Sequence, residues 1–183
     1  MSAARDALLA RIIDHVAVRG LADTSLRELA DEVGTSHRML NYHFGGRAGL
    51  VTAIVSATEA AQRQALAELG RGAATPEAVI EAQWEQLTQP ELAPLIRLFF
   101  ELFSLALADH PGTEGFLDGI TEPWLAVAAD VAEELDLAVD RTELRLGVAV
   151  VRGLLIEALA AGDPADATAS LRRYLELWAA SRS

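Results

Sequence analysis

Two short helical patterns separated by a glycine, within residues 24–47, constrain the fold of this 183-residue chain more than any other feature. The segment reads TSLRELADEVGTSHRMLNYHFGGR. Its first half repeats apolar residues at helical spacing, and Ser25 with Glu28 forms a Ser-x-x-Glu capping box that satisfies the first free amides of a helix. The spacing predicts a helix that begins near Ser25 and ends near Val33.

Gly34 follows the last apolar position of this helix. The chain needs a left-handed residue there, and glycine adopts that conformation at low cost because it has no Cβ. Ser36 is suited to cap a second helix over residues 37–43. The pattern therefore predicts two helices joined by a tight turn.

The residues around this turn have the sizes that a close helix crossing requires. Ala30 and Gly34 are small, and Leu40 lies six residues beyond the glycine. The spacing A-x3-G-x5-L is that of a helix-turn-helix, whose second helix reads the major groove of DNA. Met39 or Leu40, together with Phe44, forms the inner face of the second helix. An ordinary surface helix pair with a glycine turn is the structural alternative.

An amphipathic helix that precedes the motif ends in Arg-Gly-Leu at 19–21, and the motif ends in Leu-Asn-Tyr-His-Phe at 40–44, before a glycine pair and an arginine. With these surroundings, about residues 5–55 resemble the TetR family of bacterial transcriptional repressors. Two features depart from the family pattern. Asn41 stands where the family usually has a phosphate-contacting tyrosine, and the segment 46–49 lacks the usual cap and acidic residues of the fourth helix.

The resemblance implies an all-α fold in two domains. Residues 1–46 are expected to form a three-helix helix-turn-helix DNA-binding domain, and residues 47–183 a six-helix ligand-binding and dimerisation domain. By their position, the residues expected to read DNA bases are Arg27, Thr35, His37 and Arg38. Those expected to hold DNA phosphates are Ser25, Ser36, Asn41, Tyr42, His43 and Arg47.

The distribution of charge confines DNA binding to the N-terminal end. A formal net charge of −12 opposes binding to a phosphate backbone. However, residues 1–50 hold six arginines and six acidic residues, whereas residues 51–183 hold nine arginines and twenty-one acidic residues. Every Lys or Arg position is arginine, whose planar fork binds phosphate and guanine through two bonds. A neutral N-terminal domain predicts only modest non-specific affinity for DNA.

Beyond the motif the sequence predicts six more helices and no strand. Pro76 starts one of them, capped by Thr75, and Pro94 confines the regular part of the next to the residues that follow it. The expected ranges are 47–69, 76–88, 91–109, 121–135, 141–161 and 165–180, with a short helical turn at 116–120.

The last two helices predict a homodimer. The helix over 141–161 is apolar on nearly all sides, so both its own domain and another surface must cover it. The residues expected at the interface are Val151, Leu155, Leu171, Leu175 and Trp178. A dimer would place two reading helices about 34–36 Å apart on a palindromic operator. The alternative is that both helices simply belong to the core.

Most of the aromatic side chains lie between residues 84 and 124. Such rings either fill a helical core or line a cavity, and for any single ring core packing is the simpler reading. The resemblance implies that this region binds a small-molecule inducer, which should be mainly apolar. The residues expected at this ligand site are Trp84, Phe99, Phe100, Phe103, Phe116, Trp124 and Arg152.

The composition argues against an enzyme. The chain has no cysteine, its four histidines are dispersed, and no glycine-rich phosphate loop follows a strand. We therefore expect no catalytic residues, no metal and no cofactor. The N-terminus does not read as a signal peptide, and the longest apolar stretch, 95–108, is shorter than the roughly 20 residues that span a bilayer. A cytoplasmic protein with no membrane partner is expected.

Together these observations predict a DNA-binding transcriptional regulator. The expected form is a repressor that binds a palindromic operator as a dimer and is released by a small ligand. The alternative function is an all-α adaptor that uses its helix pair to bind protein and does not bind DNA.

Overall fold

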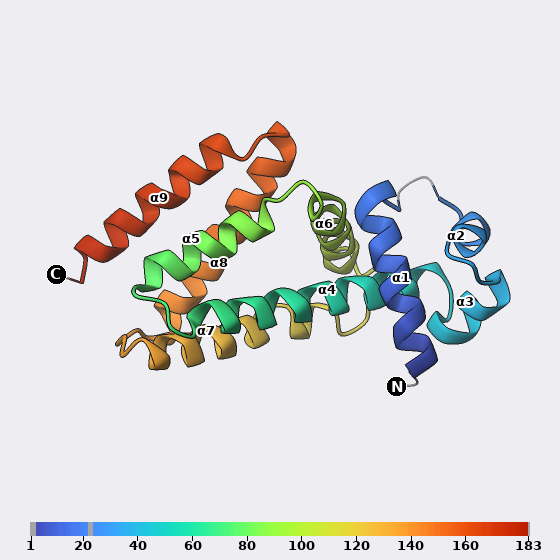
Figure 1. The fold of residues 1–183 in the computed structure, drawn as a ribbon, viewed down its shortest axis with the longest axis horizontal. Coiled ribbons are helices and arrows are strands. Elements are labelled where there is room, and N and C mark those ends of the chain that lie inside the picture. The colour runs from blue at the N-terminus through green and yellow to red at the C-terminus, as the bar shows by residue number, and fades with distance from the viewer. Residues whose placement is uncertain (1–2, 22–23, 183) are drawn as a thin grey trace. The chain divides into compact units, whose positions relative to one another are not determined.

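The computed structural model describes residues 3–21 and 24–182. Over these residues the chain forms nine α-helices and one short 3-10 turn, with no strand, as the sequence predicts (Figure 1). The helices are α1 (Ala3–Arg19), α2 (Leu26–Glu32), α3 (His37–Phe44), α4 (Arg47–Gly70), α5 (Pro76–Leu87), α6 (Ala93–Leu107), α7 (Glu122–Glu134), α8 (Arg141–Ala161) and α9 (Ala165–Ala180). The short turn, η1, spans Leu117–Gly119.

The helix limits follow local signals that the sequence displays. The Thr75 hydroxyl accepts a hydrogen bond from the backbone N–H of Ala78, and Pro76 opens α5. At α8, Asp140 and Glu143 form a second capping box, and Gly162 ends the helix in the left-handed conformation. The differences from the predicted limits are small and fall at helix ends, where the closing hydrogen bonds are weakest.

The chain packs as two compact units. Unit 1 comprises Met1–Ala60 and Glu91–Leu117, and unit 2 comprises Ala61–Pro90 and Asp118–Ser183. The limit between them falls inside α4. The domains predicted above, 1–46 and 47–183, divide the chain by role and stay a prediction.

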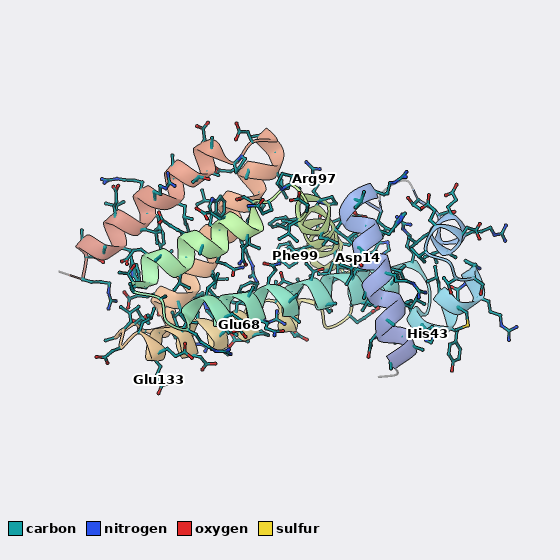
Figure 2. All side chains as sticks on the ribbon, in the orientation of Figure 1. Asp14, His43, Glu68, Arg97, Phe99 and Glu133 are labelled. Carbon is teal, nitrogen blue, oxygen red and sulfur yellow. The ribbon has the colours of Figure 1, made fainter. Side chains whose placement is uncertain are left out.

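Unit 1 contains the helix-turn-helix segment and a core shared by α1, α4 and α6. Ile12, Leu29, Leu50 and Ile54 are completely buried in this core. Helix α1 packs against α6, from which Phe99 joins the same core (Figure 2). The two short helices therefore rest on a support formed by longer helices.

Unit 2 is built from α5, α7, α8, α9 and the second half of α4. Helix α8 packs against both α7 and α9. The indole N–H of Trp84 on α5 donates to the Thr168 hydroxyl on α9 at 2.8 Å, which satisfies the polar atom of a side chain that is only 2% exposed. Leu171 and Leu175 of α9 are buried within this unit.

Candidate functional site

The start of α2 is fixed by the capping box that the sequence predicts. The backbone N–H of Ser25 donates to Glu28 Oε2 at 2.8 Å, and the N–H of Glu28 donates to Ser25 Oγ at 3.2 Å. The first of these bonds, from the backbone N–H of Ser25, is the main reason why the pKa of Glu28 lies below its ordinary value. The Glu28 carboxylate is therefore ionised at neutral pH and holds the helix start.

The turn between α2 and α3 also has the predicted geometry. Gly34 is left-handed, with φ +68°, and the N–H of Thr35 closes the end of α2 by donating to the Ala30 carbonyl at 2.8 Å. Ser36 then caps α3 by accepting from the N–H of Met39 at 3.2 Å. These local bonds set the direction in which α3 leaves the turn.

The inner face of α3 is Leu40 and Phe44, which are 1% and 7% exposed. This resolves the choice between Met39 and Leu40, because Met39 is 40% exposed. The outward face carries hydrogen-bonding side chains, and all four are exposed: His37, Arg38, Asn41 and Tyr42. Such a face matches what a major-groove helix presents to base edges and phosphates.

The other residues predicted to contact DNA differ in their exposure to solvent. Arg27, Ser25 and Ser36 are exposed, whereas Thr35 and His43 are half-buried. Asn41 lies one helical turn from His37, and its amide nitrogen is 3.1 Å from Nε2 and 3.3 Å from Nδ1 of that ring. The Asn41 amide therefore lies within hydrogen-bonding distance of the ring of a predicted base-reading residue.

Two contacts that support α3 and α2 were missed by sequence reasoning. Arg5 of α1 donates from Nε to the His43 carbonyl at 3.4 Å, and its guanidinium lies 5.1 Å from the centre of the Phe44 ring. His15 of α1 lies with Nε2 2.9 Å from Oε2 of Glu32 in α2. No sequence signal reveals either pair, because the partners are far apart along the chain.

The junction between α3 and α4 is tightly constrained by its glycines. Gly45 and Gly46 have φ of +72° and +118°, a region that L side chains rarely adopt. A Cβ at Gly49 would overlap the carbonyl oxygen of Phe44, so the first turn of α4 rests directly on the end of α3. These glycines are therefore needed for the geometry of the junction.

Arg47, expected at a DNA phosphate, is engaged within unit 1. Its two terminal nitrogens donate to the backbone carbonyls of Thr24 and Leu21 at 2.5 and 2.6 Å.

The residues expected at the ligand site fall into two groups. Phe99, Phe100, Phe103 and Phe116 lie together in unit 1, and the centre of the Phe99 ring is 5.1–6.1 Å from the centres of the other three. In unit 2, Trp84 is buried, and Arg63 lies 5.9 Å from the centre of the Trp124 ring. A shared role in ligand binding stays a prediction.

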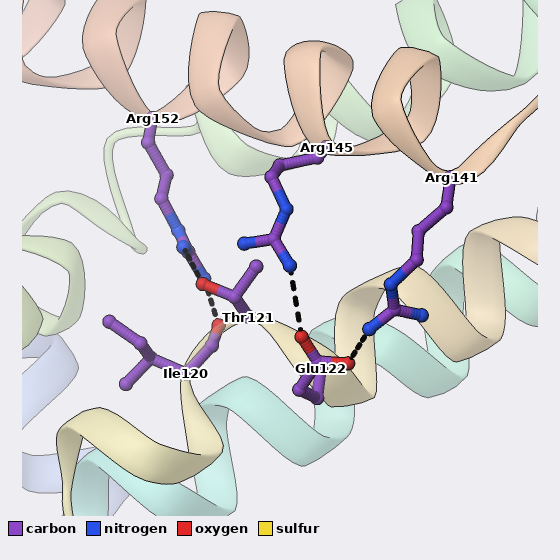
Figure 3. Close-up of polar contacts among 6 residues, drawn as sticks. All are labelled: Ile120, Thr121, Glu122, Arg141, Arg145 and Arg152. Atoms are coloured by element: carbon purple, nitrogen blue, oxygen red, sulfur yellow. Dashed lines mark hydrogen bonds and ion pairs between the residues drawn. The ribbon is translucent and has the colours of Figure 1, made fainter.

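Arg152 belongs to a row of arginines on α8 that faces the start of α7 (Figure 3). It donates to the Thr121 hydroxyl at 3.0 Å and to the Ile120 carbonyl. Glu122 pairs with Arg141 and Arg145 of the same row, and the hydrogen bond from Arg141 is the main cause of its lowered pKa. These contacts fasten α8 to α7.

Among the residues expected at a dimer interface, three are buried inside unit 2. Leu155, Leu171 and Leu175 are 8%, 1% and 3% exposed, so they pack within their own chain, while Val151 and Trp178 are half-buried. Their place at an interface stays a prediction.

A different stripe of residues on α8 is exposed to solvent, and it consists of apolar side chains and one glycine. Its residues repeat at spacings of three and four, and hence share one helix face: Leu146, Ala149, Gly153, Ile156 and Ala160. Sequence periodicity did not find this stripe, because α8 is apolar on nearly all sides and only packing shows which side is left uncovered.

The described residues were also compared with the requirements of a metal site and of a membrane-spanning helix, and they meet neither. In residues 3–21 and 24–182, no group of three or more His, Asp or Glu side chains is arranged to hold a metal ion. Among the helices described, none combines the length and the apolar character needed to cross a membrane.

Comparison with known proteins extends the likeness to the whole chain. A structure assigned to the TetR family of transcriptional regulators from Rhodococcus sp. superposes with a TM-score of 0.73 and 24% identity, covering 97% of this chain and 98% of that one. A TetR-family transcriptional regulator from Pectobacterium atrosepticum gives 0.71 and 20%, covering 96% and 91%. SmeT in complex with triclosan gives 0.61 and 20%, covering 87% and 81%.

The sequence comparisons concern the helix-turn-helix region. No curated protein matches the chain. Residues 8–54, which include α2, the glycine turn, α3 and the start of α4, match the family model described as bacterial regulatory proteins, tetR family. This region is therefore similar to the DNA-binding region of the tetR family, and the whole chain shares its fold with the regulators compared above.

Proposed function

We propose that this protein is a ligand-controlled repressor that binds a palindromic DNA operator as a homodimer. The single observation that carries the proposal is the exposed polar face of α3, held outward by the glycine turn and the two serine caps. Nothing in the structure favours the adaptor alternative over this reading.

The reading of DNA is assigned to α3 and the residues beside it. His37 and Arg38 begin α3 and would enter the major groove, with Thr35 and Arg27 at the edges of the contact. One good bidentate contact from Arg38 to a guanine would contribute about 1–3 kcal/mol of discrimination. The phosphate contacts are proposed for Ser25, Ser36, Asn41, Tyr42 and His43.

The dimer is supported by the exposed stripe of α8 described above. Its Gly153 has open space where a Cβ would lie, so the helix backbone itself is accessible along the stripe. A second copy of the same stripe, related by a two-fold axis, would bury both surfaces. Dimerisation also explains how a neutral N-terminal domain gains affinity, because two α3 helices bind one DNA molecule together.

A small, mainly apolar ligand is proposed as the signal that releases the operator. The aromatic clusters of both units support an apolar ligand, and the buried Gln83 on α5 supports one that also forms a hydrogen bond. Gln83 Nε2 donates to Gln62 at 3.2 Å, but Oε1 has no partner among the described residues. Because SmeT was solved with triclosan, this compound is a reasonable first probe for the present chain.

Selection of bound duplexes from a random DNA pool tests the proposal most directly. A recovered palindrome with half-sites one helical turn apart would support DNA binding and dimerisation together. Recovery of no sequence preference at low salt, where electrostatic binding is strongest, would exclude operator recognition. Addition of triclosan to the protein bound to the selected duplex then tests whether an apolar phenol releases it.

A further inference from the structure

The contacts of Arg47 indicate a role different from that of a phosphate ligand. Arg47 is the first residue of α4, and its guanidinium donates through Nη1 to the Thr24 carbonyl and through Nη2 to the Leu21 carbonyl. The two donor–acceptor distances are 2.5 and 2.6 Å, and the donor carries a positive charge, which strengthens such hydrogen bonds. Both terminal nitrogens are therefore used inside the protein.

The two carbonyls belong to the connection between α1 and α2. Leu21 is anchored in the core at 4% exposure, and its carbonyl also accepts from the N–H of Thr24 at 3.3 Å. Thr24 immediately precedes Ser25, which caps α2. Arg47 thus fixes Thr24, which precedes the cap of α2, relative to Leu21, which is buried in the core.

From this geometry we infer that Arg47 is a positioning residue that sets the start of α2, and through it the orientation of the helix-turn-helix, by clamping the α1–α2 connection to α4. The structural part of this inference rests on the contacts of Arg47 alone, and its effect on DNA binding rests on the proposed function. It revises the expectation from sequence that Arg47 holds a DNA phosphate.

The chemistry of the side chain makes this role specific to arginine. A guanidinium presents its terminal nitrogens in a planar fork, which reaches two separate acceptors at once. The lysine ammonium is a single charged centre on a flexible stem, so it would hold a DNA phosphate well but would not reproduce both carbonyl contacts. The Arg47→Lys variant therefore distinguishes a clamp on the two carbonyls from a DNA phosphate ligand.

The first experiment needs no DNA. Backbone amide exchange is measured in the full-length protein and in its Arg47→Lys, Arg47→Met and Arg71→Met variants. Arg71 is an exposed arginine just beyond the end of α4, and it pairs with Glu68, at the other end of this helix from Arg47. The amides of Glu28 and Leu29, which bond to Ser25, report on the start of α2. We expect their exchange to accelerate at least tenfold in both Arg47 variants and not in Arg71→Met.

The second experiment measures binding to the selected duplex and to a random duplex over a range of salt concentration, at a temperature where every variant is folded. A clamp predicts that Arg47→Lys and Arg47→Met both lose about tenfold in affinity for the selected duplex and keep the wild-type salt slope. Loss of a phosphate contact would instead reduce the slope by about one in Arg47→Met, and lysine would restore binding.

The two experiments fail in different ways. Unchanged amide exchange in both Arg47 variants would overturn the clamp, even if the protein binds DNA. Accelerated exchange in a protein that selects no duplex would support the clamp and overturn the proposed function. Lower thermal stability with unchanged affinity in the folded variants would reduce Arg47 to a purely structural role and would overturn positioning.

Discussion

Individual residues at the start of α2 show how short-range hydrogen bonds fix the helix-turn-helix. Ser25 and Glu28 satisfy each other's backbone N–H groups, and the bond from the Ser25 N–H lowers the pKa of the Glu28 carboxyl. A cap of this kind contributes about 1 kcal/mol to helix stability. The start of α2, and with it the helix-turn-helix, therefore depends on two side chains that need not touch a base.

Replacement of Ser25 by alanine should lower the free energy of unfolding by about 1 kcal/mol. The expected loss follows because alanine leaves the amide of Glu28 without its acceptor. Chemical denaturation of the variant and the wild type measures the difference. A serine-to-alanine change at the exposed Ser56 in α4 serves as the control and should have little effect.

The Glu28 contribution should depend on pH. Because the pKa of Glu28 in the folded protein lies below its ordinary value of 4.5, the stabilisation is complete above that value and is lost as the pH falls through the lower, folded value. The difference in melting temperature between wild type and Glu28→Ala should thus be largest near neutral pH and shrink on acidification below about pH 4. A difference that grows on acidification would contradict this assignment.

Gln83 is a buried amide whose Oε1 has no partner among the described residues. Burial of an unsatisfied polar atom costs about 1–3 kcal/mol. Gln83→Leu should therefore raise the free energy of unfolding by about 1 kcal/mol, after the loss of the bond to Gln62. Gln86→Leu, at an exposed position of the same helix, is the matched control, and denaturation of both variants provides the measurement. A marked loss of stability in Gln83→Leu would show that the amide is fully satisfied.

At the scale of the elements, the first turn of α4 is held from three sides of unit 1. Arg47 bonds to the α1–α2 connection, Gly49 rests on the end of α3, and a side chain at Gly112 would come within 2.9 Å of the Cβ of Ala48. The glycines at this junction permit the close approach of α4 to the helix-turn-helix.

Gly49→Ala should therefore disturb both stability and DNA binding. The added Cβ would meet the Phe44 carbonyl, which belongs to the backbone and cannot rotate away. Gly147→Ala is the matched control, because it also lies in a helix but would meet only the Tyr174 hydroxyl at 3.8 Å, an ordinary contact. We expect a lower melting temperature for Gly49→Ala and an unchanged or higher one for Gly147→Ala. Equal melting temperatures would show that α4 moves aside without cost.

For the whole molecule, the feature that bears most on assembly is the stripe of α8 that its own chain leaves exposed. Leu146 and Ile156 are 53% and 52% exposed, which is high for large apolar side chains. The interior side of α8 and α9 is already filled by Leu155, Leu171 and Leu175. A second copy would therefore pack on the exposed stripe and leave these buried leucines undisturbed.

The double variant Leu146→Glu with Ile156→Glu should be a folded monomer. Four buried charges at a two-fold interface would be unpaired and desolvated, whereas the same glutamates remain in water on a monomer. Analytical ultracentrifugation should show half the wild-type mass, and affinity for the selected duplex should fall at least a hundredfold. Leu107→Glu on α6, which is also highly exposed, should change neither property. A monomeric wild type, or a dimeric double variant, would exclude this interface.

The sequence by itself determined the helices, their caps and the glycine turn. Each of these depends on hydrogen bonds between residues a few positions apart. Residues such as Ser25, Glu28 and Gly34 therefore predict them without knowledge of the tertiary structure. The same is true of the outward face of α3, because helical spacing separates it from Leu40.

Only the tertiary structure decided the partners of Arg47, the support of α3 by Arg5 and the side of α8 that stays uncovered. The contacts of Arg47 and Arg5 join residues 23 to 38 positions apart, and helical periodicity cannot predict which distant groups meet. An arginine beside a DNA-binding motif reads as a phosphate ligand from sequence. In the folded chain the guanidinium of Arg47 instead bonds to the backbone carbonyls of Thr24 and Leu21. These carbonyls lie within its reach because Leu21 and the start of α4 are held against the same core.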